Sequence, residues 1–314
     1  MNPPRAPRQS KDDMIKAFVS LVSLICLGLT TVGLSGCSPL ALFDALGPRD
    51  KGGRLVLKDA AYGEDPRQRL DVFVPSVAPE RAPVLVFFYG GSWNSGSKAD
   101  YAFAAQALAA QGFVTVLPDY RLYPKVRFPD FLEDGAAAIA WVRDNIAAYG
   151  GDAHRIVLAG HSAGAYNAAM LGLNPEYLRR VGVDPRSIRA VAGLSGPYDF
   201  LPFDQKASID AFGQAPDPEA TQPITYAGPH SPPTFLATGE ADTVVRPRNT
   251  ESLAARLRTA RVPVQERVYP GLDHSDTLLA LSVTFRRKAP VLAEMSAFLH
   301  QHAGAKRLTT LTMH

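Results

Sequence analysis

The stretch Arg155-Ile-Val-Leu-Ala-Gly-His-Ser-Ala-Gly164 carries the pattern that decides the fold. Its first part, Arg155–Ala159, is predicted to be a buried strand, and Ala163–Leu173 is predicted to be the helix that follows at once. The two glycines that flank Ser162 remove side chains that would collide in so tight a strand-to-helix turn. In this context Gly-x-Ser-x-Gly is a nucleophile elbow, so Ser162 is the candidate nucleophile.

A second glycine-rich stretch, Tyr89-Gly90-Gly91-Ser92-Trp93, follows the apolar run Pro83–Tyr89, and Gly96-Ser97-Lys98 comes shortly after it. Together with the elbow at Ser162, these motifs resemble the α/β-hydrolase carboxylesterases of the hormone-sensitive-lipase-like group. The resemblance is greatest to the bacterial ferulate-esterase-like branch, with its His-Gly-Gly-x-Trp and downstream Gly-x-Lys. The departure is Tyr89, where that branch usually has a histidine that holds the loop. We therefore expect a retuned loop and an intact site.

The glycine-rich loop is the candidate oxyanion hole. Acyl transfer needs N–H donors aimed at the developing alkoxide, and glycines let the backbone approach it closely. By motif position, the donors are the amides of Gly91, Ser92 and Ala163. Trp93, beside this loop, and His161, the variable residue of the elbow that packs beside the site, are the candidate substrate contacts.

The partners of the nucleophile are expected beyond it in the order acid, then histidine, each just after a strand. Gly239-Glu-Ala-Asp-Thr-Val-Val245 follows a predicted strand, and its spacing resembles the acid loop of the fold. Asp242 is therefore the candidate orienting carboxylate, with Glu240 as the alternative. His274 follows the next predicted strand and is the candidate general base and acid.

The order of apolar runs predicts an α/β protein with an α/β-hydrolase fold: a mostly parallel, twisted sheet with helices on both faces. The predicted strands are Leu55–Ala61, Arg69–Val74, Pro83–Tyr89, Phe113–Leu117, Arg155–Ala159, Ile188–Leu194, Thr234–Thr238 and Val264–Tyr269. The predicted helices are Ala99–Gln111, Phe131–Tyr149, Ala163–Leu173, Thr250–Ala260 and Pro290–Gln301.

Two further segments are expected near the site. Asp119-Tyr120-Arg121-Leu122 resembles a segment of the same esterase family, and its charged pair is expected to brace the loop beneath the site. The proline-rich stretch Gly196–Pro233 lies between two strands, where this fold carries its lid, so a short irregular lid is predicted. Its aromatic residues could form an apolar pocket or pin the loop; they are Phe200, Phe203, Phe212 and Tyr226.

The N-terminus has the order of a secretory signal: a basic start up to Lys16, an apolar run over Ala17–Leu34, and small residues at a cleavage point. Its ending, Leu34-Ser35-Gly36-Cys37, resembles a bacterial lipobox. That resemblance implies a signal peptide over 1–36 and a lipid on Cys37, which becomes the first mature residue. An ordinary cleaved signal and a spanning anchor stay open, because roughly 20 apolar residues can cross a bilayer.

By the lipoprotein sorting pattern, Ser38 after the cysteine implies the outer membrane of a Gram-negative cell. We therefore expect an exported protein held to the cell envelope by its lipid anchor. Residues 37–53 are predicted to be a tether with a short helical piece at Leu40–Leu46. The catalytic domain is predicted over 54–303, and a tail over 304–314.

Composition excludes several classes of function. The 314 residues are 46% hydrophobic with a net charge of +3, and the basic residues form no dense run, so nucleic acid is not expected as a partner. Both cysteines, Cys26 and Cys37, precede the predicted domain, which excludes a disulfide framework, a thiolate metal site and a cysteine nucleophile there. No ligand pattern for a metal is visible, and the chemistry needs no cofactor.

The sequence thus predicts a serine hydrolase that cleaves a small carboxylic ester through an acyl-enzyme. The same Ser–His–Asp arrangement supports amide hydrolysis, so a formamidase or peptidase activity stays open. An alternative of another class is a surface lipoprotein that binds without turnover.

Overall fold

Two apolar runs become neighbouring strands at the centre of the fold. In the computed structural model, which describes residues 39–77 and 80–304, strand β3 (Ala82–Phe88) pairs in parallel with β5 (Gly151–His161). Every residue of β3 is buried. A continuous run of Val, Leu and Phe suits this position, because a central strand of a parallel sheet is covered on both faces.

Eight strands form one sheet in the order β1-β2-β4-β3-β5-β6-β7-β8. The pairs β1–β2 and β2–β4 are antiparallel, and the strands from β4 to β8 run parallel. The remaining bounds are β1 (Gly53–Ala61), β2 (Arg69–Pro75), β4 (Val114–Pro118), β6 (Ile188–Leu194), β7 (Thr234–Gly239) and β8 (Val264–Tyr269). The predicted mostly parallel sheet, opened by a hairpin, is confirmed.

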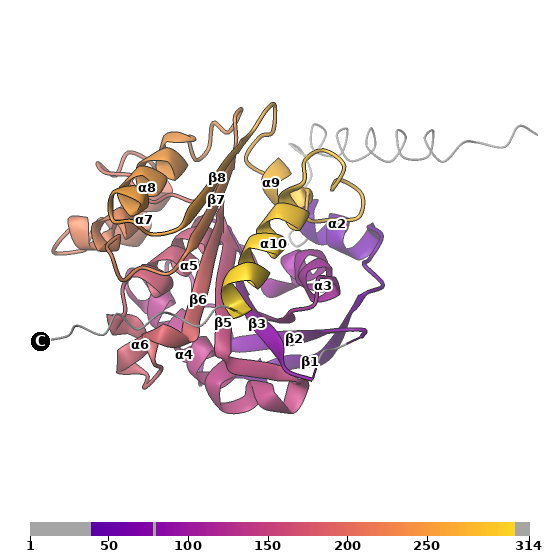
Figure 1. Cartoon of the computed structure of the whole chain (residues 1–314). Helices are drawn as coiled ribbons and strands as arrows, with labels where there is room; N and C mark the ends of the chain where they lie inside the picture. Colours follow the sequence, from indigo (N-terminus) through magenta and orange to yellow (C-terminus); the bar gives the residue numbers. More distant parts are fainter. Residues whose placement is uncertain (1–38, 78–79, 305–314) are drawn as a thin grey trace, which may run out of the picture.

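Helices cover both faces of this sheet (Figure 1). On one face lie α3 (Ala102–Ala110) and α10 (Val291–Gly304), and on the other lie α4 (Asp130–Asn145), α5 (Ala163–Leu173) and α8 (Arg248–Thr259). Because these strands are parallel, their carboxyl ends lie at one edge of the sheet, which is where ligands bind in open α/β folds. The α/β-hydrolase fold class is confirmed.

Shorter helices account for most differences from the expected elements. The predicted helix over Phe131–Tyr149 ends its α-helical part at Asn145 and continues as the 3₁₀-helix η2 (Ile146–Tyr149). The predicted helix from Ala99 likewise begins as the 3₁₀-helix η1 (Lys98–Tyr101). Elements absent from the sequence prediction are α6 (Glu176–Arg180), η3 (Pro185–Ser187) and α9 (Asp276–Leu279). Each is about one turn long, too short for apolar periodicity to mark it.

The predicted lid is not wholly irregular. Between its prolines it contains α7 (Lys206–Phe212), η4 (Glu219–Thr221) and η5 (Pro223–Tyr226). Proline at the first position of η5 suits a helix start, because its missing N–H would be unpaired there in any case. The lid segment therefore has local structure that its proline content concealed.

At the N-terminal side, the helical piece expected at Leu40–Leu46 is present as α2 (Pro39–Leu46). Its Phe43 packs edge-on against Phe103, with ring centroids 5.2 Å apart, and the Asp44 carboxylate accepts the Phe103 amide at 2.7 Å. This part of the predicted tether is thus attached to the domain. The predicted signal over 1–36, Cys37 and residues 305–314 of the predicted tail lie outside the described residues. Within 39–77 and 80–304, no helix is long and apolar enough to cross a membrane.

Candidate active site

Ser162 lies at the turn between β5 and α5 with a strained backbone, φ 54° and ψ −125°. The turn is tight because helix α5 passes directly over the end of β3. A Cβ on Gly164 would lie 2.0 Å from the carbonyl oxygen of Phe88, and one on Gly160 would lie 2.3 Å from that of Gly164. Only glycine fits at these two positions, so the pattern quoted at the start has a direct steric cause.

Three predicted residues come together at the carboxyl edge of the sheet. The Oγ of Ser162 lies 2.9 Å from Nε2 of His274, and Nδ1 of His274 lies 2.8 Å from Oδ2 of Asp242. Asp242 follows β7 and His274 follows β8, so neighbouring parallel strands deliver both. An ionised carboxylate accepts hydrogen bonds only, so Nδ1 carries the proton and Nε2 is free to accept from the serine.

Asp242 is held in its ionised form. Burial opposes ionisation, but the hydrogen bond and charge of His274, the Val245 amide and the Ser195 hydroxyl together lower the pKa of Asp242. Its Oδ1 accepts the amides of Val244 and Val245 at 3.0 and 2.9 Å. The alternative carboxylate, Glu240, is exposed and accepts the Gly271 amide at 3.2 Å. Asp242 is therefore the carboxylate that faces the imidazole.

The loop after β3 lies against the nucleophile, since a Cβ on Gly90 would be 2.9 Å from Cβ of Ser162. Ser92 and Trp93 both have positive φ, 52° and 58°, which for residues other than glycine is a stored strain of roughly 1–3 kcal/mol each. Among the described residues, the amides of Gly91, Ser92 and Ala163 donate to no acceptor. These are the three donors expected from the motif, and they are available to a bound oxyanion.

The two candidate substrate contacts are buried. Trp93 is 5% exposed; its Nε1 donates to Oδ1 of Asn167 at 3.2 Å, and it packs edge-on against Phe212 and Tyr166 at 4.7 and 5.3 Å. His161 is 5% exposed as well, and protein groups occupy both of its ring nitrogens. Neither set of contacts supports the predicted role in substrate binding. Trp93 packs against aromatic rings of the lid and of α5, and the two ring nitrogens of His161 are bonded to Tyr101 and to the carbonyl of His274.

Three of the four lid aromatics, Phe200, Phe203 and Phe212, join Trp93 in one cluster, whereas the Tyr226 hydroxyl donates to the carbonyl of Ala220 within the lid at 2.9 Å. Phe200 stacks on Trp93 at 6.4 Å, and Phe203 stacks on Phe212 at 5.9 Å. Phe131 of α4 completes the cluster, stacked on Trp93 at 6.1 Å. Of the two roles left open for the lid aromatics, these contacts favour pinning of the lid against the oxyanion loop.

Tyr89, the departure from the family motif, is held by Arg67. The guanidinium Nη2 donates to the Tyr89 hydroxyl at 2.5 Å and to the carbonyl of Gly96 at 2.9 Å, while Nε donates to the carbonyl of Tyr120 at 2.8 Å. Tyr89 also stacks on Tyr120 with centroids 4.5 Å apart. Burial raises the pKa of the Tyr89 phenol, so it stays neutral. Sequence reasoning missed Arg67 because it lies in a hairpin turn, far from the loop it holds.

Asp119 and Arg121, the two charged residues expected to brace the loop, bind different partners and not each other. Oδ1 of Asp119 accepts the amide of Lys98 at 2.7 Å, whereas Arg121 pairs with Asp134 of α4 at 2.8 Å. The Lys98 ammonium reaches back to Asp59 and Asp71 at 2.6 and 2.7 Å. Each charge therefore braces the region by joining a different element, and the Gly-x-Lys motif ties the oxyanion loop to the opening hairpin.

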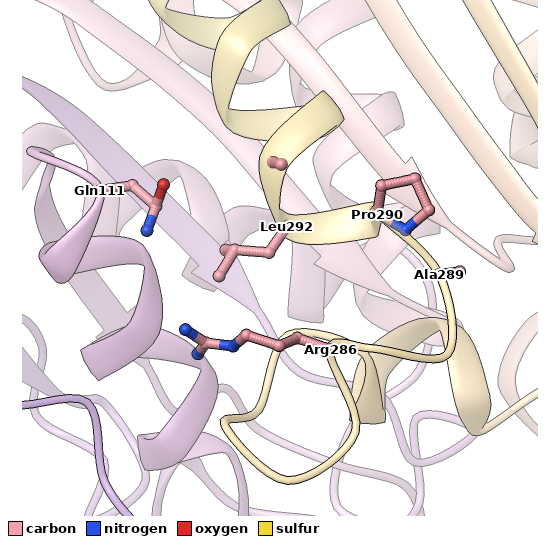
Figure 2. Close-up of a pocket in the computed structure, with 6 residues that line it drawn as sticks. Gln111, Arg286, Ala289, Pro290 and Leu292 are labelled. Atoms are coloured by element: carbon pink, nitrogen blue, oxygen red, sulfur yellow. The ribbon is translucent and has the colours of Figure 1, made fainter.

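A separate cavity of about 190 Å³ lies between the end of α3 and the start of α10 (Figure 2). Its lining residues include Gln111, Arg286 and Pro290, none of which is a candidate site residue. Arg286 already pairs with Asp50 and donates to the carbonyl of Leu281. In the described part of the chain, no group of His, Cys, Asp and Glu could hold a metal ion.

Comparison with known proteins places the chain in a family. The BD-FAE family model matches residues 70–257, so the chain belongs to this α/β-hydrolase esterase family, and the predicted resemblance is confirmed. It is similar to esterase LipC of Mycobacterium tuberculosis, with 34% identity over 76% of this chain and 64% of LipC. A probable isoprenylcysteine alpha-carbonyl methylesterase of Oryza sativa is 30% identical over 71% of this chain and 58% of its own length.

The chain spans about three fifths of the length of these curated relatives. Among solved structures, a phosphonate-inhibited esterase B of Lactobacillus rhamnosis has a TM-score of 0.75 at 17% identity, over 94% of this chain and 97% of that one. At this identity the likeness shows the fold.

The two acidic candidates can be separated by matched substitutions. Asp242→Asn should lower kcat for a p-nitrophenyl ester by about 10³–10⁴-fold, because an amide no longer selects the Nδ1–H tautomer of His274. Glu240→Gln, an exposed change of the same kind, should leave kcat within about twofold. Steady-state kinetics on both folded variants measure the difference. Equal losses would contradict the assignment of Asp242.

Proposed function

We propose that this protein is a serine carboxylic-ester hydrolase that acts on small-molecule esters through an acyl-enzyme. The observation that carries the proposal is the hydrogen-bonded line from Ser162 through His274 to Asp242, with distances of 2.9 and 2.8 Å. Three unpaired amides beside Ser162 supply the electrostatic part of the chemistry. Membership of the BD-FAE family supports the same reaction class.

In the proposed acylation, Oγ of Ser162 attacks the ester carbonyl carbon while its proton passes to Nε2 of His274. The carbonyl oxygen becomes an oxyanion that accepts hydrogen bonds from the amides of Gly91, Ser92 and Ala163. The bond to the alcohol oxygen then breaks, and the imidazolium gives that oxygen its proton. Asp242 stabilises the imidazolium and keeps its orientation throughout.

Deacylation repeats the sequence with water. Nε2 of His274 takes a proton from the water as its oxygen attacks the acyl carbon, and the same amides hold the second oxyanion. Collapse of this intermediate breaks the bond to Ser162, whose Oγ regains the proton from His274. The carboxylic acid is released, and the free enzyme is restored.

Amide hydrolysis is the second candidate, because the same groups can expel an amine. The names of the similar proteins, an esterase and a methylesterase, favour esters over amides. Binding without turnover is disfavoured, because a pure binding site needs no ionised Asp242 aligned with an imidazole and a serine.

Ser162→Ala should remove nearly all hydrolysis of p-nitrophenyl acetate. At most a roughly 10³-fold acceleration over water should remain, which binding and an oxyanion hole alone provide. The matched control is Ser187→Ala, a half-buried serine away from the site whose hydroxyl donates to the carbonyl of Asp184 at 2.7 Å. Its activity should equal that of the parent. Full activity of Ser162→Ala would refute the proposed function. A kcat/KM for formamides above that for the paired esters would favour the amide candidate.

We further propose that the chain is exported and held to the cell envelope by a lipid on Cys37. The order of basic, apolar and small residues before Cys37 supports this. Only one residue, Ser38, separates that cysteine in the sequence from Pro39, the first residue of helix α2.

Expression in a Gram-negative host with an alkyne fatty-acid label tests the anchor. The parent should incorporate the label and partition with membranes, because multiple acyl chains hold stably. Cys37→Ser should lose the label, and Cys26→Ser, the matched control within the apolar run, should keep it. An unlabelled parent, or a labelled Cys37→Ser, would contradict the proposal.

A further inference from the structure

The histidine inside the elbow makes two hydrogen bonds whose directions are settled by chemistry. Nε2 of His161 lies 3.0 Å from the main-chain carbonyl oxygen of His274. A carbonyl oxygen can only accept, so Nε2 carries the hydrogen and donates. In a neutral imidazole Nδ1 is then an acceptor, and the Tyr101 hydroxyl, 3.1 Å away, donates to it.

The Tyr101 hydroxyl also lies against the oxyanion loop. A Cβ on Gly90 would lie 2.9 Å from the Tyr101 hydroxyl oxygen, so this hydroxyl packs closely against the loop. The two hydrogen bonds therefore run in one direction, from Tyr101 through His161 to the carbonyl of His274. They join the first turn after the oxyanion loop to the elbow and to the loop after β8, and the packing of Tyr101 on Gly90 adds the oxyanion loop itself.

Burial keeps this connection in one protonation state. Tyr101 and His161 are each 5% exposed. Burial, and next the charge of His274, lower the pKa of His161 to about 3, although its hydrogen bond to the His274 carbonyl and the charge of Asp242 oppose the change. A neutral His161 matters because its ring centroid lies 5.0 Å from that of His274, which becomes a cation during acyl transfer.

The main chain of His274 has one other side-chain donor among the described residues. Oγ1 of Thr277 lies 3.3 Å from the same carbonyl oxygen. Thr277 is three residues away, in helix α9, and its Oγ1 also lies 3.0 Å from Oγ of Ser195 just after β6, so this contact relates the loop to β6 and not to the elbow directly. The contact from His161 comes from across the sheet, and His161 is covalently joined to Ser162.

We propose that His161 and Tyr101 are positioning residues that hold the main chain of His274 in register with the nucleophile and the oxyanion loop. This inference rests on the proposed function. The side chain of His274 is oriented by Asp242, but its distance to Ser162 also depends on where its backbone lies. Displacement of a reacting group by about 1 Å can lower a rate about 10²-fold, so an anchor on the backbone has kinetic consequences.

Replacement of the imidazole tests the proposal. His161→Phe keeps a ring but removes both hydrogen bonds, and it should lower kcat for p-nitrophenyl acetate by about 30–100-fold with KM within about twofold. His161→Gln places an amide donor near the position of Nε2, and it should recover at least about fivefold of that loss. Recovery by a donor separates positioning from simple loss of packing.

Tyr101→Phe removes one hydroxyl and keeps the ring, so it should fold as the parent does and lower kcat by about three- to tenfold. In the double variant with His161→Phe, the loss should be close to that of His161→Phe alone, because both residues act through the same connection. Losses that multiply would show independent effects and overturn the proposed connection.

His300 provides a matched control at the opposite edge of the sheet. Its Nε2 also donates to a main-chain carbonyl, that of Gln111, at 2.8 Å, and its ring stacks on Phe113 just before β4. His300→Phe should lower the unfolding midpoint and leave kcat per folded molecule unchanged. The rate of labelling of Ser162 by a fluorophosphonate should follow kcat across the set.

A folded His161→Phe variant with kcat within about twofold of the parent would overturn the positioning role. An equal loss in His300→Phe would overturn it too, because the effect would then be one of general stability. Absence of ester hydrolysis in the parent protein is a distinct result, which refutes the proposed function itself.

Discussion

The close passage of helix α5 over the end of β3 is the contact on which the site depends. A Cβ on Gly164 would lie 2.0 Å from the Phe88 carbonyl oxygen, so a larger residue would push the helix away from the strand. This contact brings the β3 loop within reach of Ser162 and leaves the Ala163 amide at the helix start. Nucleophile and oxyanion donors are thus placed together by one steric requirement.

The strain at Ser162 depends on the same contact. A serine with φ 54° is held only where the surroundings leave no alternative, and here its amide also donates to the carbonyl of Leu194 in β6 at 2.9 Å. β6 in turn pairs with β7, and β7 with β8, the strands that precede Asp242 and His274. The pairing of β6 with β7 and of β7 with β8 therefore fixes the positions of Asp242 and His274 relative to the elbow.

Much of this could be predicted from the sequence, because strand ends in a parallel sheet meet at one edge. The apolar run before Tyr89 and the glycines around Ser162 were sufficient to place the central strands and the turn. Asp242 and His274 could be named because each follows a strand in the expected order. The one-turn helices α6 and α9 could not, since a single turn has no apolar period.

Two polar contacts that sequence reasoning missed are long-range. Arg67 reaches Tyr89 from a hairpin turn, and Tyr101 reaches His161 from the other side of the oxyanion loop. No local pattern marks such pairs, because their partners are defined only once the sheet has formed. The Tyr89 hydroxyl accepts from Arg67, and the Tyr101 hydroxyl, packed on Gly90, donates to the neutral His161, so the loop without the family histidine is held by contacts of another kind.

Intact-mass and peptide mapping after treatment with a fluorophosphonate tests the central claim most directly. The arrangement of Ser162, His274 and Asp242 predicts a single adduct, on the peptide that contains Ser162, and its absence from Ser162→Ala. No adduct on the parent protein, or an adduct on a different serine, would contradict the account.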